Sequence, residues 1–176
     1  MERTTRMTAL KTLLVAAAFI GTLSAASAAF AADEYNVSTG TTLSGAGVAL
    51  RGVDAVALAT GLKETPGHAK YTVEHDGVAY YFSTEATMKR FAADPERYMP
   101  QYGGFCAFGV AIGKKLDATG RFADIVDGKL YVFLNAAAFG KYKEDKAGTL
   151  AKAEKNWPGM HHVSVAEVNG LESAMR

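Results

Sequence analysis

Apolar residues first gather near the start of the chain. Leu13–Leu23 is almost wholly apolar; a stretch with three basic residues precedes it, and a run of small residues follows it, ending in Ala29-Phe30-Ala31. A basic start, an apolar stretch of about 7–15 residues and a small-x-small end are the three parts of a secretory signal peptide. We therefore predict a signal peptide over residues 1–31, cleavage after Ala31 or next best after Ala32, and export to the periplasm. A membrane-spanning helix needs about 20 apolar residues, so no stable membrane insertion is expected after cleavage.

Farther along, alternating stretches indicate strands. Asp76-Gly77 and Asp127-Gly128 each stand between two stretches rich in β-branched and aromatic residues. Such a dipeptide is the strongest short signal for a β-hairpin, because both turn residues need a positive φ. The predicted hairpins have their tips at 75–78 and 126–129 and consist of Lys70–His75 with Val78–Ser83, and of Phe122–Val126 with Lys129–Leu134. Val53–Leu58 is predicted to be a short strand, in which Asp54 caps backbone N–H groups.

Helical spacing follows both hairpins. After the first, Ser83 or Thr84 can cap a helix with Met88, Phe91 and Ala92 on its apolar face, and Asp94-Pro95 ends it. The other predicted helices are a short one within Gln101–Ile112 after a glycine turn, one over Ala136–Lys143 capped by Asn135, and one over Gly148–Trp157. Hairpins separated by helical pieces predict an α+β fold, a small antiparallel sheet built from β-hairpins and packed with short helices.

Composition indicates one domain without a large charged surface. Residues 32–49 are polar and rich in Gly, Ser and Thr, which predicts a flexible lead-in; residues 50–158 form the predicted domain, and residues 159–176 a C-terminal extension. The chain has 19 Lys and Arg against 18 Asp and Glu, and the signal peptide removes three of the former and one of the latter. The remaining net charge of roughly −1 gives no basic footprint for nucleic acid. We find no internal repeat, and the many aromatic residues are expected to form the core.

Three segments together resemble the YHS-domain family in its exported single-domain form. They are Leu50–Ala57, Gly77–Tyr98 with its aromatic strand and D-P-x-x-Y ending, and Pro100–Ala107, whose PQYGGFCA is similar to the family's P-Q-Y-G-G-[YF]-C-A signature. The resemblance covers about residues 50–158 and implies a YHS-like fold that binds a metal ion, with copper as the candidate. The family's other cysteine positions hold Ala57 and Ser83 here, so thiolate ligands are not carried over to them.

Cys106 is the single cysteine, so no internal disulfide can form. The preceding Gly103-Gly104 allows an unusual backbone, and free N–H groups in the first turn of a following helix would lower the pKa of the thiol. By resemblance, the exported branch keeps this cysteine, some relatives carry selenocysteine there, and the thiol is expected to do chemistry. The alternative is a small buried side chain, which is how most free cysteines behave.

Met160, His161 and His162 are adjacent nitrogen and sulfur donors of the kind that copper accepts. Because neighbouring residues on an extended chain point to opposite sides, one ion is not expected to take both rings in regular structure. A solvated tail explains the trio as well. His75, at the mouth of the first hairpin, and His68, in a Pro-Gly loop, are weaker candidates that are equally typical of solvated loops.

No other enzyme motif occurs: G-x-S-x-G, H-E-x-x-H, C-x-x-C and P-loop patterns are absent from the sequence. We therefore favour a non-enzymatic periplasmic YHS-like protein that binds a soft metal ion such as copper, or a small ligand, at a site containing Cys106. The further candidate metal ligands are His162, His161, Met160 and His75. Two alternatives stay open, a thiol redox protein or sensor that uses Cys106 as nucleophile, and an interaction module whose cysteine is structural.

Overall fold

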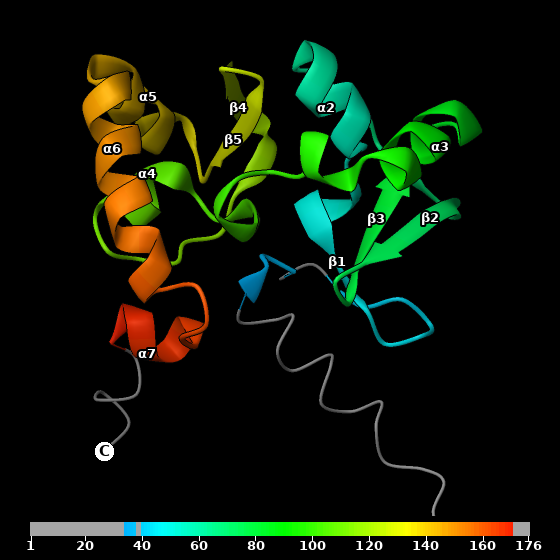
Figure 1. Cartoon of the computed structure of the whole chain (residues 1–176), viewed down its shortest axis with the longest axis horizontal. Coiled ribbons are helices and arrows are strands. Elements are labelled where there is room, and N and C mark those ends of the chain that lie inside the picture. Colours follow the sequence, from blue (N-terminus) through cyan, green and yellow to red (C-terminus); the bar gives the residue numbers. More distant parts are fainter. Residues whose placement is uncertain (1–33, 38–39, 171–176) are drawn as a thin grey trace, which may run out of the picture.

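The computed structural model describes residues 34–37 and 40–170, so the predicted signal peptide lies outside the described residues. Two groups of strands and helices lie side by side in it (Figure 1). We call residues 47–97 the first half and residues 99–145 the second half. The chain is a mixture of helices and short sheets, which confirms the α+β class.

The first half is a three-stranded sheet with two short helices packed on it. β2 (His68–His75) and β3 (Val78–Phe82) are antiparallel, and β1 (Gly47–Val48) runs parallel to β3. η1 (Ala49–Gly52) and α2 (Ala55–Gly61) precede β2, and α3 (Glu85–Ala93) with η2 (Pro95–Arg97) follows β3. Asp76 and Gly77 form the turn between β2 and β3 with φ of 50° and 75°, and Thr84 caps α3. The first predicted hairpin and the helix after it are confirmed.

The second half has its own two-stranded sheet. η3 (Tyr102–Gly104) and α4 (Ala107–Ala111) lead to the antiparallel strands β4 (Thr119–Val126) and β5 (Lys129–Phe133), and α5 (Ala136–Glu144) follows. Asp127 and Gly128 turn the chain with φ of 52° and 74°. Asn135 caps α5, because its Oδ1 accepts the Ala138 N–H at 2.9 Å. The second predicted hairpin and its capped helix are also confirmed. α6 (Lys146–Asn156) then packs against α4.

The two halves repeat the same order of elements. The first strand, second strand and following helix start at 68, 78 and 85 in the first half and at 119, 129 and 136 in the second, a constant step of 51 residues. The two hairpins even share a register shift at the same place, after His68 in β2 and after Thr119 in β4. The expectation of no internal repeat is therefore wrong. The two halves have turns, helix caps and buried rings at matching positions. Different residues can fill such positions, so the repeat cannot be seen in the sequence.

The repeat extends upstream to a left-handed turn and a capped helix. Leu50, Arg51 and Gly52 have φ of 51°, 53° and 75°, and the counterparts Tyr102, Gly103 and Gly104 have φ of 56°, 59° and 79°. The next cap residues also match. The Asp54 N–H donates to the Thr65 carbonyl at 2.8 Å, and the Cys106 N–H donates to the Leu116 carbonyl at 2.9 Å. Cys106 is thus the counterpart of Asp54.

Helix α2 stands where a strand was predicted over Val53–Leu58, and that prediction is wrong. Asp54 Oδ1 accepts the N–H groups of Val56 and Ala57 at 2.9 Å and 3.0 Å. An Asp N-cap satisfies N–H groups that have no partner inside the helix, and three alanines among the first five helical residues favour helix. Together these outweigh the β-preference of the valines. The capping role predicted for Asp54 is confirmed.

Aromatic side chains fill matching places in the core of each half. The ring centroid of Phe91 in α3 lies 4.6 Å from that of Tyr80 and 5.0 Å from that of Phe82. In the second half, Tyr142 of α5 lies 4.4 Å from Phe133. All five side chains are at most 1% exposed. Burying a ring of this size contributes about 1.5–3 kcal/mol, so these pairs are a main source of stability in each half.

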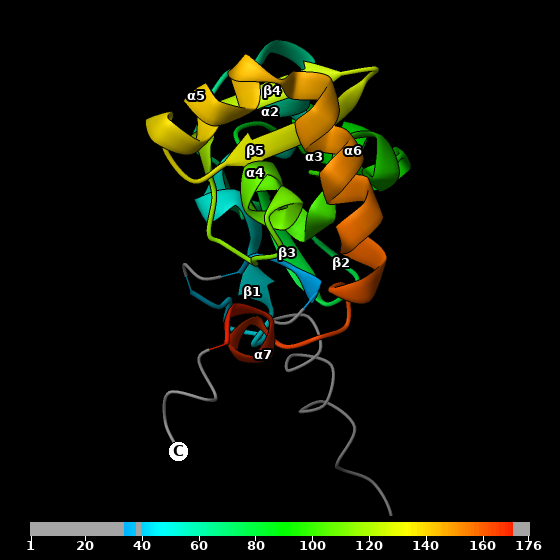
Figure 2. The same cartoon turned by 90° about the vertical axis from the view of Figure 1, so that its left-hand side faces the viewer.

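Both ends of the described chain pack on the second half. Asn36, within the predicted lead-in, donates from its backbone N–H to the Gly103 carbonyl at 2.8 Å and from Nδ2 to the Gly104 carbonyl at 3.1 Å. After α6, η4 (Trp157–Gly159) leads to α7 (Val165–Asn169), which was not predicted and lies at the lower end of the molecule (Figure 2). In the ranges that the structure describes, no helix is long and apolar enough to cross a membrane.

Candidate functional site

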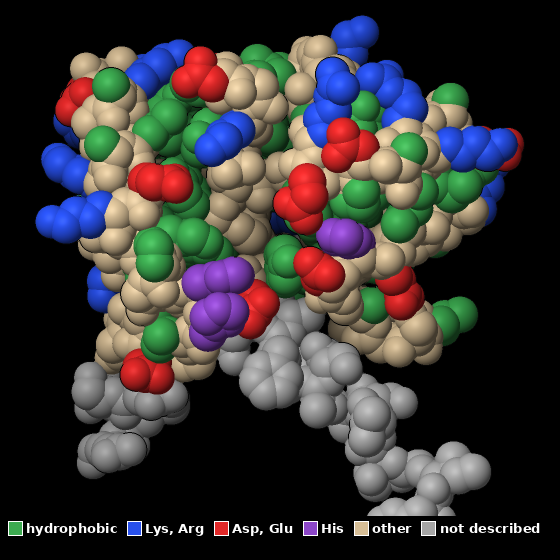
Figure 3. All heavy atoms as spheres, viewed as in Figure 1, with side chains coloured by type: hydrophobic (Ala, Val, Ile, Leu, Met, Phe, Trp, Pro, Cys, Tyr) green, Lys and Arg blue, Asp and Glu red, His purple; other side chains and the backbone are tan. Residues whose placement is uncertain are grey.

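Three side chains with metal-ligand atoms meet at one place on the surface: Glu34, His161 and His162. Their ligand atoms all lie within 4.8 Å of one another. His162 Nδ1 is 2.5 Å from Glu34 Oε1, and His161 Nε2 is 3.8 Å from Glu34 Oε2. Figure 3 shows two adjacent histidine side chains in contact with an acidic one on the viewed face. Glu34 and His161 are half-buried and His162 is exposed, so solvent and ions can reach the group.

The two histidine rings lie together because the chain turns between them. After η4, the His161 N–H donates to the Trp157 carbonyl at 2.9 Å, and the Val163 N–H donates to the Met160 carbonyl at 3.1 Å. The two ring centroids are 4.2 Å apart with an interplanar angle of 34°. The expectation that the rings would point to opposite sides assumed an extended backbone and does not apply in this turn.

Lys115 anchors this turn from inside the protein. Its side chain is 1% exposed, and Nζ donates to the carbonyl oxygens of His161 at 3.0 Å and of Val163 at 2.6 Å. The ring centroids of Phe105 and Trp157 lie 5.3 Å and 5.6 Å from Nζ, within the range of cation–π attraction. Lysine is almost never fully buried without partners. These bonds fix where the histidine turn lies.

Glu34 reaches the group from the other end of the described chain. Its backbone lies directly on Gly103, where a Cβ would overlap the Glu34 carbonyl oxygen, so glycine is required at this position. The two hydrogen bonds of Asn36 hold the same segment, and the Tyr35 hydroxyl donates to Asp76 Oδ2 at 3.1 Å. Sequence reasoning missed Glu34. It lies 128 residues from His162, and no local pattern marks it as a ligand.

The electrostatic surroundings favour a neutral His161 ring. Burial lowers the pKa of His161, the nearby His162 and Lys115 lower it further, and only Glu34 acts in the opposite direction. A neutral imidazole is the form that binds a metal ion. Two imidazole nitrogens and one carboxylate oxygen suit Cu²⁺, Zn²⁺, Ni²⁺ or Fe²⁺, whereas a soft ion such as Cu⁺ prefers sulfur ligands.

Met160 and His75 lie elsewhere. The Met160 side chain is 7% exposed and belongs to the core. His75 Nε2 is buried and, among the described residues, has no hydrogen-bond partner, although Asp76 Oδ2 and Glu96 Oε1 lie 3.6 Å and 3.7 Å away. Neither residue belongs to the group of Glu34 and the two histidines.

Cys106 is fully buried at the N-cap of α4. Its Sγ accepts the Gly109 N–H at 3.4 Å, so it caps the helix as Asp54 caps α2. Within the described chain, Cys106 belongs to no group of three residues that could hold a metal ion. Its role as a metal ligand stays a prediction.

The comparison with Asp54 explains why a thiol stands at position 106. Asp54 Oδ2 accepts hydrogen bonds from the Ser83 N–H at 2.8 Å and from the Ser83 and Thr87 hydroxyls at 2.6 Å and 2.7 Å. At the corresponding places of the second half, 134 and 138, stand leucine and alanine, which have no hydroxyl. A buried carboxylate without those donors would be costly. A weakly polar thiol caps the helix without that cost.

Comparison with known proteins gives a result for one part of the chain. Neither a curated protein nor a solved structure matches the chain. The matched segment begins at the end of α2, contains β2, β3, α3 and η2, and stops before Gly103. His75 lies inside this segment. Cys106, Glu34 and the histidine pair lie outside it. Over this segment, residues 61–102, the chain matches the model of the YHS domain family.

Proposed function

We propose that the protein is an exported YHS-like metal-binding protein that holds one divalent transition-metal ion between Glu34, His161 and His162. The observation that carries this proposal is the convergence of two imidazole nitrogens and a carboxylate within 4.8 Å, brought from opposite ends of the described chain. Copper or zinc is the preferred ion, because imidazole and carboxylate ligands suit both.

The spacing of the ligand atoms supports the proposal. An ion with bonds of about 2.0–2.2 Å to nitrogen and oxygen keeps two ligand atoms no more than about 4.4 Å apart. The pairs at 2.5 Å and 3.8 Å already meet this condition, and no pair of ligand atoms in the group is more than 4.8 Å apart. The exposed His162 edge leaves room for water or another ligand to complete the coordination.

The surroundings of Cys106 support placing the ion at the histidine pair. The thiol is buried in the core and already accepts a backbone N–H, whereas Glu34 and His161 are only half-buried. A soft ion at Cys106 would need to displace core packing and would find no grouped ligands among the described residues.

Metal titration of the purified full chain tests the proposal. We expect one Cu²⁺ or Zn²⁺ per chain by isothermal titration calorimetry and, for Cu²⁺, an electron paramagnetic resonance spectrum with coupling to two imidazole nitrogens. His161→Ala and Glu34→Gln should each weaken binding by about tenfold or more, as loss of a ligand or its support does in other metal sites.

His68→Ala is the matched control, because His68 is an exposed histidine at the start of β2 and outside the group. It should leave the affinity unchanged. Absence of saturable binding, or an equal loss in His68→Ala and His161→Ala, would refute the assigned site.

We further propose that binding takes place in the periplasm. The basic, apolar and small-residue parts of the N-terminus support export. Cleavage after Ala31 would leave Glu34 as the third residue of the mature chain, so the proposed ligand would be retained.

A further inference from the structure

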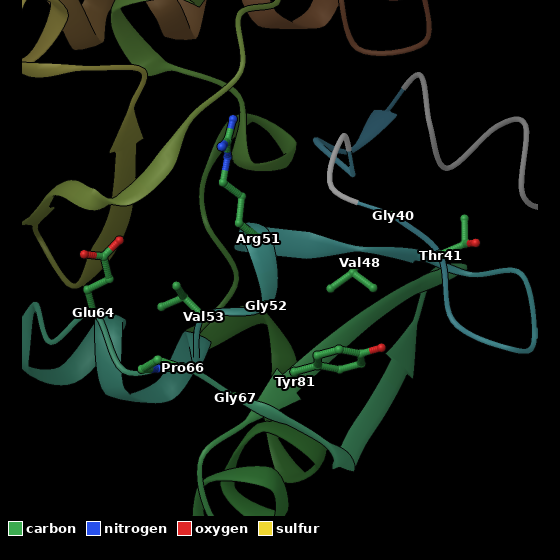
Figure 4. A pocket seen from close by; sticks show the side chains of 10 residues that line it. All are labelled: Gly40, Thr41, Val48, Arg51, Gly52, Val53, Glu64, Pro66, Gly67 and Tyr81. Carbon is green, nitrogen blue, oxygen red and sulfur yellow. The ribbon is translucent and has the colours of Figure 1, made fainter.

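The hairpin of β2 and β3 presents two different faces. On one face, Tyr81 lies along an open pocket of about 530 Å³ (Figure 4). Its neighbour Tyr80 points to the opposite face, because successive side chains of a strand alternate. There Tyr80 packs on Phe91, and the His75 ring meets Phe91 edge-on with the ring centroids 6.4 Å apart. Polar groups gather on this second face, at the tip of the hairpin.

His75 brings a buried ring nitrogen to this place. Its Nε2 is buried and has no hydrogen-bond partner among the described residues. Asp76 Oδ2 lies 3.6 Å from Nε2 and Glu96 Oε1 lies 3.7 Å from it, and both distances are too long for a hydrogen bond. A buried polar atom that no protein group satisfies indicates an ion or a water molecule that completes its bonding.

The two carboxylates have no basic side chain to balance their charge. Within the part of the chain that the structure describes, neither Asp76 nor Glu96 forms an ion pair with a lysine or arginine. Burial and the hydrogen bond to Asp76 raise the pKa of Tyr35 to about 12, and burial with the nearby Tyr35, Asp76 and Glu96 raises the pKa of Tyr80. The place beside Nε2 therefore has a negative potential, which attracts a cation.

The second half lacks this group of side chains. At the step of 51 residues, its counterparts are Val126, Asp127 and Ala147. An aspartate stands in both halves because the Asp-Gly turn favours it. The repeated fold therefore explains the aspartate but neither His75 nor Glu96.

We propose that His75, Asp76 and Glu96 form a second metal site, which binds Mn²⁺ or a similar divalent ion. Two carboxylates favour a harder ion than the histidine pair does, and the imidazole favours a transition metal over Mg²⁺ or Ca²⁺. Mn²⁺ meets both conditions. The site shares no ligand with the group of Glu34, His161 and His162, so this proposal does not rest on the proposed function.

The geometry allows the three ligands to reach one ion. Bonds of about 2.2 Å keep two ligand atoms no more than about 4.4 Å apart, and the distances of 3.6 Å and 3.7 Å from Nε2 fall within this limit. The two carboxylates lie farther from each other, since among the described residues only the Glu34 group has three ligand atoms all within 4.8 Å. The side chains of Asp76 and Glu96 are 57% and 78% exposed and can rotate toward the ion. The Tyr35 hydroxyl donates to Asp76 Oδ2 at 3.1 Å and orients that carboxylate.

Titration of the ¹⁵N-labelled full chain with Mn²⁺ tests this site by nuclear magnetic resonance. The His161→Ala background is used, so that the result does not depend on the proposed copper or zinc site. Bound Mn²⁺ broadens nearby signals through its unpaired electrons. We expect broadening centred on the backbone signals of His75, Asp76 and Glu96 that saturates with a Kd of about 1 mM or tighter.

Asp76→Asn and Asp127→Asn form a matched pair of variants, because Asn-Gly forms the same turn as Asp-Gly. Asp76→Asn should weaken Mn²⁺ binding by about tenfold, and Asp127→Asn in the second hairpin should leave it unchanged. His75→Gln should act like Asp76→Asn. His68→Gln, which changes an exposed histidine at the start of the same strand, should act like Asp127→Asn.

Equal effects of Asp76→Asn and Asp127→Asn would indicate scattered binding to surface carboxylates and would overturn the proposal. Binding that His75→Gln does not alter would also overturn it. If no saturable broadening occurs at the hairpin tip, the proposal is wrong and a water molecule is the partner of His75 Nε2.

Discussion

Gly103 lies directly against the carbonyl oxygen of Glu34, and a Cβ on residue 103 would overlap that oxygen. Gly103 also has a φ of 59°, in the left-handed region that side chains disfavour. The contact joins the PQYGGFCA segment to the carboxylate of the proposed metal site. The glycine pair of this segment is therefore explained by the close passage of the chain over it.

Gly103→Ala is expected to displace Glu34 and weaken Cu²⁺ or Zn²⁺ binding by about tenfold, because the ligand moves away from the histidines. Gly128→Ala is the matched control: Gly128 also has a positive φ, of 74°, but nothing lies within 4 Å of the added Cβ. It should cost about 1 kcal/mol of stability through strain alone and keep the affinity. Equal affinities in the two variants would contradict this role of Gly103.

Lys115→Met should loosen the histidine turn while retaining most of the buried volume. The carbonyls of His161 and Val163 lose their ammonium donor, and metal affinity is expected to fall by about tenfold, since a mispositioned ligand binds less well. In the metal-free protein, the nuclear Overhauser contacts between the two histidine rings should weaken as well. Lys152→Met, on the exposed face of α6, should change neither. Unchanged ring contacts in Lys115→Met would rule out the anchoring role.

The fully buried Asp54 should make the stability depend on pH. Burial acts to raise its pKa, but hydrogen bonds from Ser83, Ala57 and Thr87 outweigh burial and hold the pKa below the usual 3.8. Because the folded-state pKa is lowered, this contribution is complete above the unfolded-state value and is lost as the pH falls through the folded-state value.

Asp54→Asn should therefore lower the free energy of unfolding at neutral pH by about 3 kcal/mol and flatten its fall in acid. Denaturant unfolding between pH 7 and pH 3 measures both effects. Asp94→Asn, on an exposed residue at the end of α3, is the control and should preserve the wild-type profile. If the free energy of unfolding of Asp54→Asn fell with pH in parallel with that of the wild type, this carboxylate would not govern the acid transition.

Cys106 should react with iodoacetamide only when the protein unfolds, because its thiol is inaccessible in the core. Cys106→Ser should cost about 1–2 kcal/mol of stability and leave metal affinity unchanged, since it buries a hydroxyl away from the proposed site. A Leu43→Cys change in the Cys106→Ser background supplies an exposed thiol and should react rapidly. Rapid alkylation of Cys106 in the folded protein would favour the thiol redox hypothesis instead.

Export should yield a mature chain that begins at Ala32 or close to it. N-terminal sequencing of protein from the periplasmic fraction measures this, and Ala31→Arg should prevent cleavage because the position before the cut requires a small residue. Ala46→Ser, far from the cut, should be processed normally. An intact Met1 on soluble cytoplasmic protein would contradict the assignment.

Much of the local structure could be predicted from the sequence, because short-range interactions decide it. The two Asp-Gly turns need only their own positive φ, and Thr84 and Asn135 cap the helices that follow them directly. The Asp54 cap was predicted too, yet the valines around it favoured a strand and the helix was missed. At that position the backbone hydrogen bonds of the cap outweighed side-chain preference.

Which distant residues lie close together could be learned only from the folded chain. The repeat was missed because matching positions hold different residues. Asp54 and Cys106, for example, each cap the helix that follows, but the side chains around them differ in polarity. The candidate metal group depends on a backbone contact at Gly103 and on the buried Lys115, neither of which has a periodic signal. The residue types alone show which side chains can bind a metal ion. That His161 and His162 share one partner, Glu34, follows from packing between segments far apart in the chain.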